Sequence, residues 1–152
     1  MAATNREELL LSLCWIIGEY TDINLLPDNL TTDVLSDYHE VLELFAYERM
    51  SMVKSEGSLS SSYNNRLMLV IISSLSKLAA RWQPLSNRVI LCLVKIMKHQ
   101  NYFDKSVINR ANEVITILRF PRYVYSFVKV LILKVLHRVY WNPAGWLLQI
   151  VE

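Results

Sequence analysis

Residues 63–99, YNNRLMLVIISSLSKLAARWQPLSNRVILCLVKIMKH, predict a pair of antiparallel helices and with it the class of fold. Apolar residues recur at helical spacing from Tyr63 to Arg81. Pro84 suits the first turn of a second helix that ends near His99, because the backbone N–H that proline lacks has no hydrogen-bond partner within the helix at that position. The link between the helices, Trp82-Gln83-Pro84, is very short, so we expect the second helix to turn back along the first.

The sequence before this pair predicts a long helix and a loop. Residues 55–62 contain five Ser and one Gly and have the composition of a surface loop. A helix is predicted ahead of it, from Thr31 or Thr32 to about Lys54, and residues 21–30 form a connection. The stripe of this helix that we expect to be buried consists of Val34, Leu35, Tyr38, Val41, Leu42, Phe45 and Met52.

The first predicted helix ends in a distinctive segment, Trp15-Ile16-Ile17-Gly18-Glu19-Tyr20. Thr4 and Glu7 fit a capping box at its start. Gly18 lies in its last turn, where a missing side chain would let another backbone approach closely.

After residue 99 the pattern continues with a fifth helix, from a cap at Asp104 to about Leu118. Phe120-Pro121 then forces a break. An apolar stretch at 123–139 predicts one further helix, and residues 140–152 are irregular. We expect a helical-repeat segment over 1–120 and a basic aromatic tail over 121–152.

These elements predict an all-α fold of about five to six helices. Helix pairs of this kind stack into an α-solenoid of the HEAT/armadillo type. A closed five- or six-helix bundle is the alternative. The content of 53% apolar residues and only 3 Gly excludes general disorder and argues against an all-β fold.

Charge is divided sharply along the chain. Residues 1–56 carry 3 basic and 11 acidic side chains, and residues 57–152 carry 13 basic and 3 acidic ones. One interpretation is two solvated faces of opposite sign; the other is a polarised scaffold whose basic end meets an acidic partner or a membrane.

The sequence holds no constellation of catalytic or metal-binding residues. His39, His99 and His137 lie on different helices, and we expect surface or helix-end positions for them. Cys14 and Cys92 fall in apolar helical patterns and are expected to be buried free thiols. No phosphate-binding loop or nucleophile elbow is present. We therefore predict no enzyme activity, no metal, no cofactor and no small-molecule substrate.

No targeting or membrane-spanning pattern stands out, because the N-terminus lacks a signal-peptide pattern and no apolar run is long enough for a span. The basic aromatic tail is open to more than one interpretation. Lys129, Lys134, Arg138 and Trp141 could contact lipid headgroups or a protein partner. The same residues also fit a last solenoid helix with basic side chains reaching the solvent. Nucleic acid is disfavoured, since the earlier helices offer no continuous basic face.

The segment Cys14 to Tyr20 resembles the Trp-x-x-Gly-Glu-Tyr segment of the trunk domains of large adaptin subunits in clathrin-type adaptor complexes. Residues 67–97, above all Ser74 to Arg81, and the helix Arg110 to Leu118 resemble the C-terminal part of the zeta subunit of the fifth adaptor-protein complex. The resemblance covers roughly residues 9–127.

The resemblance implies a cytosolic scaffold subunit that works with the other subunits of an adaptor complex and associated coat-like proteins, at late endosomes or lysosomes. Trp15 and Tyr20 would anchor a protein interface. Gly18 and Glu19 belong to the same candidate interface, where Glu19 would pair with an arginine or cap a neighbouring helix. Subunits of the family are several times longer, and residues 128–152 match nothing in it, so we expect a truncated or variant form. The alternative function is a small membrane-associated helical protein that binds lipid through its basic tail.

Overall fold

The structure is a computed structural model that describes residues 2–21, 28–57 and 61–120. Within these ranges it is entirely helical, which confirms the predicted class. The helices are α1 (Ala2–Tyr20), α2 (Asp28–Glu56), α3 (Ser62–Arg81), the short 3-10 turn η2 (Gln83–Leu85), α4 (Ser86–Lys98) and α5 (Lys105–Arg119). The chain divides into two compact units, Met1–Leu118 and Arg119–Glu152, and the helices lie in the first apart from the last residue of α5.

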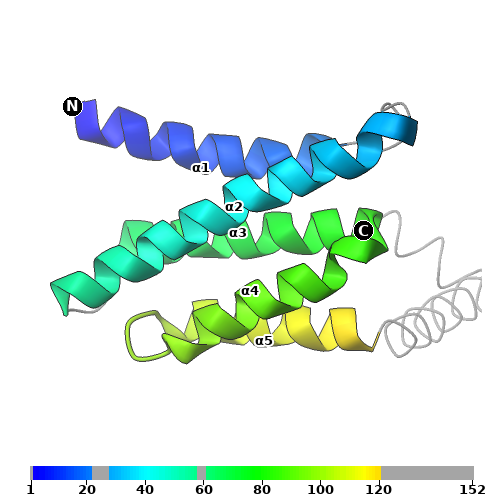
Figure 1. Cartoon of the computed structure of the whole chain (residues 1–152). Helices are drawn as coiled ribbons and strands as arrows, with labels where there is room; N and C mark the ends of the chain where they lie inside the picture. Colours follow the sequence, from blue (N-terminus) through cyan, green and yellow to red (C-terminus); the bar gives the residue numbers. More distant parts are fainter. Residues whose placement is uncertain (1, 22–27, 58–60, 121–152) are drawn as a thin grey trace, which may run out of the picture. The chain divides into compact units, whose positions relative to one another are not determined.

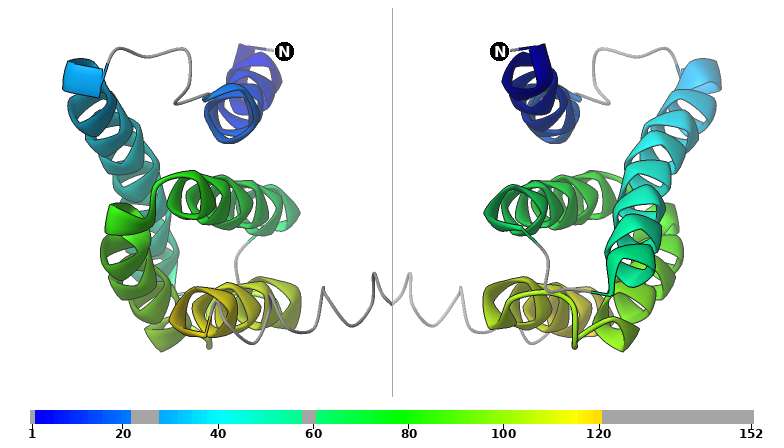
Figure 2. Two further views of the ribbon diagram at one scale, coloured as in Figure 1. Left: turned by 90° about the vertical axis from the view of Figure 1, so that its right-hand side faces the viewer. Right: turned by 90° about the vertical axis from the view of Figure 1, so that its left-hand side faces the viewer.

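Successive helices alternate in direction and stack in two layers. α3 and α4 run in opposite directions, as the short link predicts, and so do α1 and α2 (Figure 1). Seen along the helices, α1, α3 and α5 follow one another in one layer, and α2 and α4 lie in the other (Figure 2). α3 is central, since it packs against α1, α2 and α4. This arrangement is an α-solenoid, in which each helix pair contacts its neighbours rather than a closed centre.

The core follows the inner faces of both layers. Each large aliphatic side chain removed from water contributes about 2 kcal/mol, so the many buried residues of α3 and α4 hold the stack together. Side chains with no exposed surface include Leu67, Met68, Ile71, Ile72, Leu75, Leu78, Val89, Leu93 and Ile96. The two thiols, Cys14 and Cys92, are buried and free, as predicted.

Several helix boundaries differ from the prediction. α1 already begins at Ala2, so Thr4 lies within the helix and the predicted capping box is wrong. Alanine at positions 2 and 3 favours the helix, which explains its extension toward the N-terminus. α2 begins at Asp28, directly after Pro27, because a proline stops a helix only from within it.

The predicted loop at 55–62 is shorter than expected. α2 includes Ser55 and Glu56, and the hydroxyl of Ser55 donates to the carbonyl of Met52 at 2.8 Å. Gly57 has a φ of 63°, a left-handed conformation typical of the residue that ends a helix. α3 then starts at Ser62, and the Ser61 side chain accepts from the amide of Asn64 at 3.2 Å.

The buried stripe of α2 is partly different from the predicted one. Leu35 and Leu42 are fully buried, but Tyr38, Val41 and Met52 are 37%, 37% and 38% exposed. The helix has apolar residues on more than one face, and its neighbours α3 and α4 cover only one. The residues that actually make up the buried stripe are Leu35, His39, Leu42, Ala46, Met50 and Val53.

The surface or helix-end position predicted for His39 is therefore wrong, because this side chain is fully buried in the stripe. His99 does lie at a helix end, as the C-cap of α4. Pro84 lies in η2, immediately ahead of α4. Asp104 directly precedes α5, and its carbonyl accepts from the amides of Val107 and Ile108.

Other predictions fall outside the described residues. They concern the further helix at 123–139, the irregular end at 140–152, His137, and the tail residues Lys129, Lys134, Arg138 and Trp141.

Candidate functional site

The segment Trp15 to Tyr20 lies at the crossing of α1 and α3, and Gly18 makes this crossing very close. A Cβ atom added at Gly18 would lie 2.8 Å from the Cα of Ser74 and 2.5 Å from its Oγ. The close backbone approach predicted at Gly18 is thus present. The hydroxyl of Ser74 donates to the carbonyl of Cys14 at 2.7 Å and is buried.

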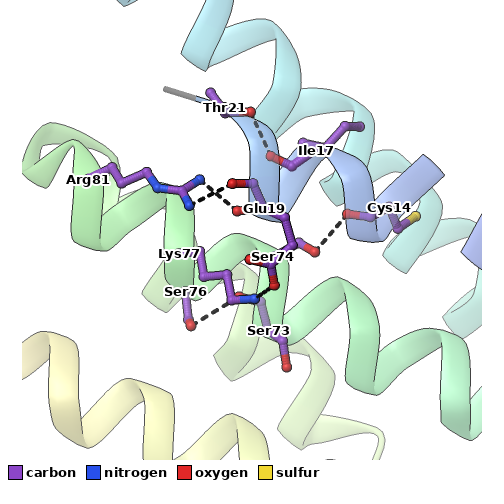
Figure 3. A network of polar contacts seen from close by, with 10 residues as sticks. Cys14, Ile17, Glu19, Thr21, Ser73, Ser74, Ser76, Lys77 and Arg81 are labelled. Carbon is purple, nitrogen blue, oxygen red and sulfur yellow. Dashed lines mark hydrogen bonds and ion pairs between the residues drawn. The ribbon is translucent and has the colours of Figure 1, made fainter. Parts of the chain in front are cut away.

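Side chains from α3 also bind the last carbonyls of α1, which have no partner within their own helix (Figure 3). The Arg81 guanidinium donates from Nη1 to the carbonyl of Gly18 at 2.6 Å and from Nη2 to the carbonyl of Glu19 at 2.9 Å. A third bond is local: the hydroxyl of Thr21, the residue directly after α1, donates to the carbonyl of Ile17 at 2.6 Å. Arginine at this position also faces the negative end of the helix dipole.

Glu19 itself forms an ion pair with Lys77 of α3. The Lys77 side chain is 40% exposed and the Glu19 side chain is 33% exposed. Because solvent screens such a pair, it adds little stability by itself. Together with the Arg81 hydrogen bonds, the Glu19–Lys77 ion pair fixes how α1 is rotated about its axis against α3. Gly18 and Glu19 are therefore engaged within the chain, in what we call the α1–α3 joint: Cys14, Gly18 and Glu19 against Ser74, Lys77 and Arg81.

Trp15 and Tyr20 take no part in the polar contacts of this joint and remain accessible. They are 48% and 69% exposed, and their rings pack edge to face with centroids 5.6 Å apart. Tyr20 also continues an exposed apolar stripe along α1, formed with Leu9, Leu13 and Ile16 at 69%, 43% and 47% exposure. Their spacing of four, three and four residues places all four on one face of the helix. α1 is thus apolar on the side facing α3 and also on a second side, which stays partly exposed in the described structure.

Sequence reasoning singled out the α1 half of the joint but missed the α3 half. Ser74, Lys77 and Arg81 are spaced at three and four residues and so share one face of α3. That spacing is a readable signal, but nothing in it says which helix the face meets.

The charge division of the sequence is used in the packing of the helices. Three ion pairs join an acidic residue before position 57 to a basic residue after it: Glu8–Arg66 at 3.4 Å, Glu40–Arg88 at 3.3 Å, and Glu19–Lys77. Each links helices from the two halves of opposite charge. The two halves are therefore partly complementary partners of one another.

A second polar cluster lies between α2 and α4. His39 has its Nδ1 atom 3.6 Å from a Glu43 carboxylate oxygen, and the burial of the ring lowers the pKa of His39. The Tyr47 hydroxyl donates to Glu43 and accepts from the Lys95 ammonium at 2.7 Å. Burial raises the pKa of the nearby Cys92 thiol to about 12, so the thiol is neutral. Because His39 has no hydrogen-bond partner in the described structure and the Lys95–Tyr47 hydrogen bond is exposed, the cluster has the character of packing contacts between α2 and α4 rather than of an acid–base pair.

Within the described residues, no group of His, Cys, Asp and Glu side chains is arranged to hold a metal ion. No described helix is both long and apolar enough to cross a membrane.

Comparison with known proteins agrees with this architecture. A model of the family described as "AP-5 complex subunit zeta-1, C-terminal TPR repeats" matches residues 1–130. Human AP-5 complex subunit zeta-1 is 26% identical over 127 residues, which cover 77% of this chain and 15% of that protein. No solved structure matches the chain.

The match bears on two predictions. TPR repeats are helix pairs that stack into a solenoid, so the predicted architecture holds, although the family description names another repeat type than HEAT or armadillo. The resemblance to a zeta subunit over roughly residues 9–127 is also confirmed. The chain spans only 15% of the length of its human relative. The family model, however, covers most of this chain, and the chain therefore belongs to the family of the C-terminal TPR repeats of AP-5 complex subunit zeta-1.

Proposed function

We propose that this chain is a segment of a non-enzymatic scaffold subunit of a cytosolic adaptor complex, acting in endosomal vesicle-mediated protein transport. Its partners in this proposal are the other subunits of the complex and associated coat-like proteins, on the surface of late endosomes or lysosomes. Membership of the AP-5 zeta-1 family supports the adaptor complex.

The observation that carries the proposal is the exposed aromatic pair on a fixed helix. Trp15 and Tyr20 present two large rings to the outside, while the joint beneath them holds α1 against α3. Aromatic residues on a rigid support are typical anchors of protein interfaces, since little conformational entropy is lost when they bind. In this proposal Gly18 and Glu19 serve the interface from below, by fixing the helix that carries the rings.

Co-expression of the full chain with the other AP-5 subunits tests this function. We expect co-elution in size-exclusion chromatography, and at least about tenfold weaker association for the double variant Trp15→Ala/Tyr20→Ala. Leu91→Ala is the matched control, because Leu91 is similarly exposed at 63% but lies on α4. Absence of co-elution with the wild-type chain would refute the adaptor proposal. Equal association of the double variant would remove the aromatic pair from the interface.

The tail residues Lys129, Lys134, Arg138 and Trp141 are proposed as a second contact, with a membrane or a partner. Flotation with anionic vesicles tests the membrane contact in the full chain. We expect the triple variant Lys129→Glu/Lys134→Glu/Arg138→Glu to lose binding, at about 1 kcal/mol for each basic residue removed. Equal flotation of this variant and the wild type would exclude these residues from lipid binding.

A further inference from the structure

A pocket of about 390 Å³ lies between α2 and α4. Tyr47 and Met50 of α2 give it apolar surface, and three lysines line it as well, Lys54 of α2 and Lys95 and Lys98 of α4. α2 and α4 are neighbours in one layer (Figure 2), and the structure describes both, so the walls of the pocket do not depend on a repeat at either end of the stack. Cavities of roughly 300–1,000 Å³ have the size that small molecules occupy.

The lysines of this pocket have no carboxylate partner. No described Asp or Glu lines the pocket or forms an ion pair with Lys54, Lys95 or Lys98. Glu43 reaches them only indirectly, through the Tyr47 hydroxyl, which donates to Glu43 and accepts from Lys95. Burial raises the pKa of Tyr47, so this hydroxyl stays neutral and does not cancel the charge of Lys95.

This gathering of like charge differs from the other contacts between the acidic and basic halves of the chain. Those contacts include ion pairs such as Glu8–Arg66 and Glu40–Arg88. Lys54, in contrast, is one of only 3 basic side chains in residues 1–56, and it shares a pocket with the lysines of α4. The negative end of a helix dipole explains a lysine at each helix end singly. It does not explain why two helices bring three of them to one pocket. Because like charges repel, this arrangement favours a bound anion.

Lys95 is already held in position for such an anion. Its ammonium donates to the Tyr47 hydroxyl at 2.7 Å and stands 4.6 Å from the centroid of the Tyr47 ring. An ammonium has three N–H donors, so two of them remain for a ligand in the described structure. The neighbouring His99 ring is fixed as well, since its Nδ1 donates to the carbonyl of Lys95 at 2.9 Å. A ligand that binds here therefore orders few side chains, which lowers the entropic cost of binding.

The type of cation indicates the type of anion. The three cations are lysines, and no arginine is among the described lining residues. The planar arginine fork matches a carboxylate, whereas lysine binds phosphate as a point charge. One phosphate monoester carries about −1.5 to −2 charges at pH 7, so a single phosphate leaves three lysines partly uncompensated. Two phosphates on one small molecule compensate them, and a polyol offers several hydroxyl groups for such esters on one compact skeleton.

We propose that the pocket between α2 and α4 binds a small polyol that carries two or more phosphate groups, either free or as the headgroup of a lipid. Lys54, Lys95 and Lys98 bind the phosphate oxygens, and the Ser51 hydroxyl in the lining donates to one of them. The apolar surface of Tyr47 packs against the carbon skeleton. The proposal concerns binding and not a reaction, and it does not depend on membership of an adaptor complex.

Isothermal titration calorimetry of the full 152-residue chain with inositol trisphosphate tests this proposal. We expect the pocket variant Lys54→Gln/Lys95→Gln/Lys98→Gln to bind inositol trisphosphate at least about tenfold more weakly than the wild type. Inositol monophosphate should bind the wild type at least about tenfold more weakly than the trisphosphate, because it compensates less of the charge.

A matched variant separates the pocket from the general charge of the chain. The control variant Arg66→Gln/Lys105→Gln/Arg110→Gln also removes three positive charges, from exposed side chains that do not line the pocket. It should bind inositol trisphosphate like the wild type. Circular dichroism confirms that both variants are folded.

Vesicle flotation distinguishes the two sources of the ligand. Phosphatidylcholine vesicles that contain phosphatidylinositol bisphosphate, which carries the same headgroup, are compared with vesicles that contain phosphatidylserine at equal total charge. Stronger binding to the first vesicles that the pocket variant loses identifies a lipid headgroup. If calorimetry shows binding and flotation shows no such difference, the ligand is the free polyol phosphate.

Three results would overturn the proposal. One is no detectable binding of inositol trisphosphate to the wild type at about 1 mM. Another is equal affinity of the pocket variant and the control variant, or equal affinity of the wild type for the monophosphate and the trisphosphate. The third is a phosphoserine peptide that binds more tightly than inositol trisphosphate and is lost in the pocket variant, since the pocket would then serve a protein partner.

Discussion

Replacing Gly18 by alanine should destabilise the chain, although alanine ordinarily favours a helix. Within a helix the change from Gly to Ala gains about 0.5–1 kcal/mol. Here the new methyl group would stand 2.8 Å from the Cα of Ser74, where two carbon atoms normally approach to about 3.5–4.0 Å. Because a backbone atom cannot rotate away, α1 and α3 must separate by roughly 1 Å at their crossing.

The size of the effect follows from what this separation disturbs. Overpacking of a close contact costs about 1–3 kcal/mol. Separation also stretches the Ser74 to Cys14 hydrogen bond, now 2.7 Å, which contributes about 1 kcal/mol. After subtraction of the gain in helix propensity, we expect a net loss of about 1–3 kcal/mol in the free energy of unfolding.

Urea unfolding of the full chain, followed by circular dichroism at 25 °C, measures this change. The midpoint should fall while the slope stays constant, since the surface exposed on unfolding is unchanged. Ser74→Gly removes the Cβ and Oγ atoms that the methyl group would meet, so the double variant should lose less than the sum of the two single losses. A Gly18→Ala protein as stable as the wild type, or two strictly additive losses, would refute the proposed tightness of the joint.

Three further predictions concern the same packing. Arg81→Ala should lower the free energy of unfolding by about 2 kcal/mol and speed amide hydrogen exchange at the C-terminal end of α1, because two carbonyls lose charged donors; unchanged exchange there would contradict the capping role. Burial raises the pKa of Cys14 to about 11 and of Cys92 to about 12, so neither thiol should react with an alkylating reagent at pH 8 until urea unfolds the chain; rapid alkylation of the native protein would contradict this. Burial lowers the pKa of His39 in the folded state, so as the pH falls the unfolded state takes up the proton before the folded state does. The free energy of unfolding should therefore decrease as the pH drops below about 6.5, by up to about 1.4 kcal/mol per pH unit. His39→Leu should show a smaller decrease in urea midpoint between pH 7 and 5.5, and an equal decrease would assign the effect to other groups.

The sequence by itself determined the local elements and their order. Helical spacing of apolar residues and the short link at Trp82 to Pro84 are local properties, and they predict the five described α-helices and their alternating directions. The segment Trp15 to Tyr20 and residues 67–97 also carried the family resemblance, which the family model confirms over residues 1–130. Helix boundaries were less well predicted: alanines extend α1 back to Ala2, and α2 continues through Ser55, whose hydroxyl donates to the carbonyl of Met52.

Only the tertiary structure decided which faces meet. α1 and α2 are apolar on more than one side, so periodicity alone could not show that Met52 stays exposed while His39 is buried. The sequence likewise could not show that Arg81 binds the end of α1, because Arg81 follows Gly18 by 63 residues and Glu19 by 62 residues. Residue types fix a helix through contacts three and four positions apart, whereas a joint or a pocket depends on how two helices lie in space. The opposite charges of the two halves are visible in the sequence, but that they pair with each other is a property of the fold.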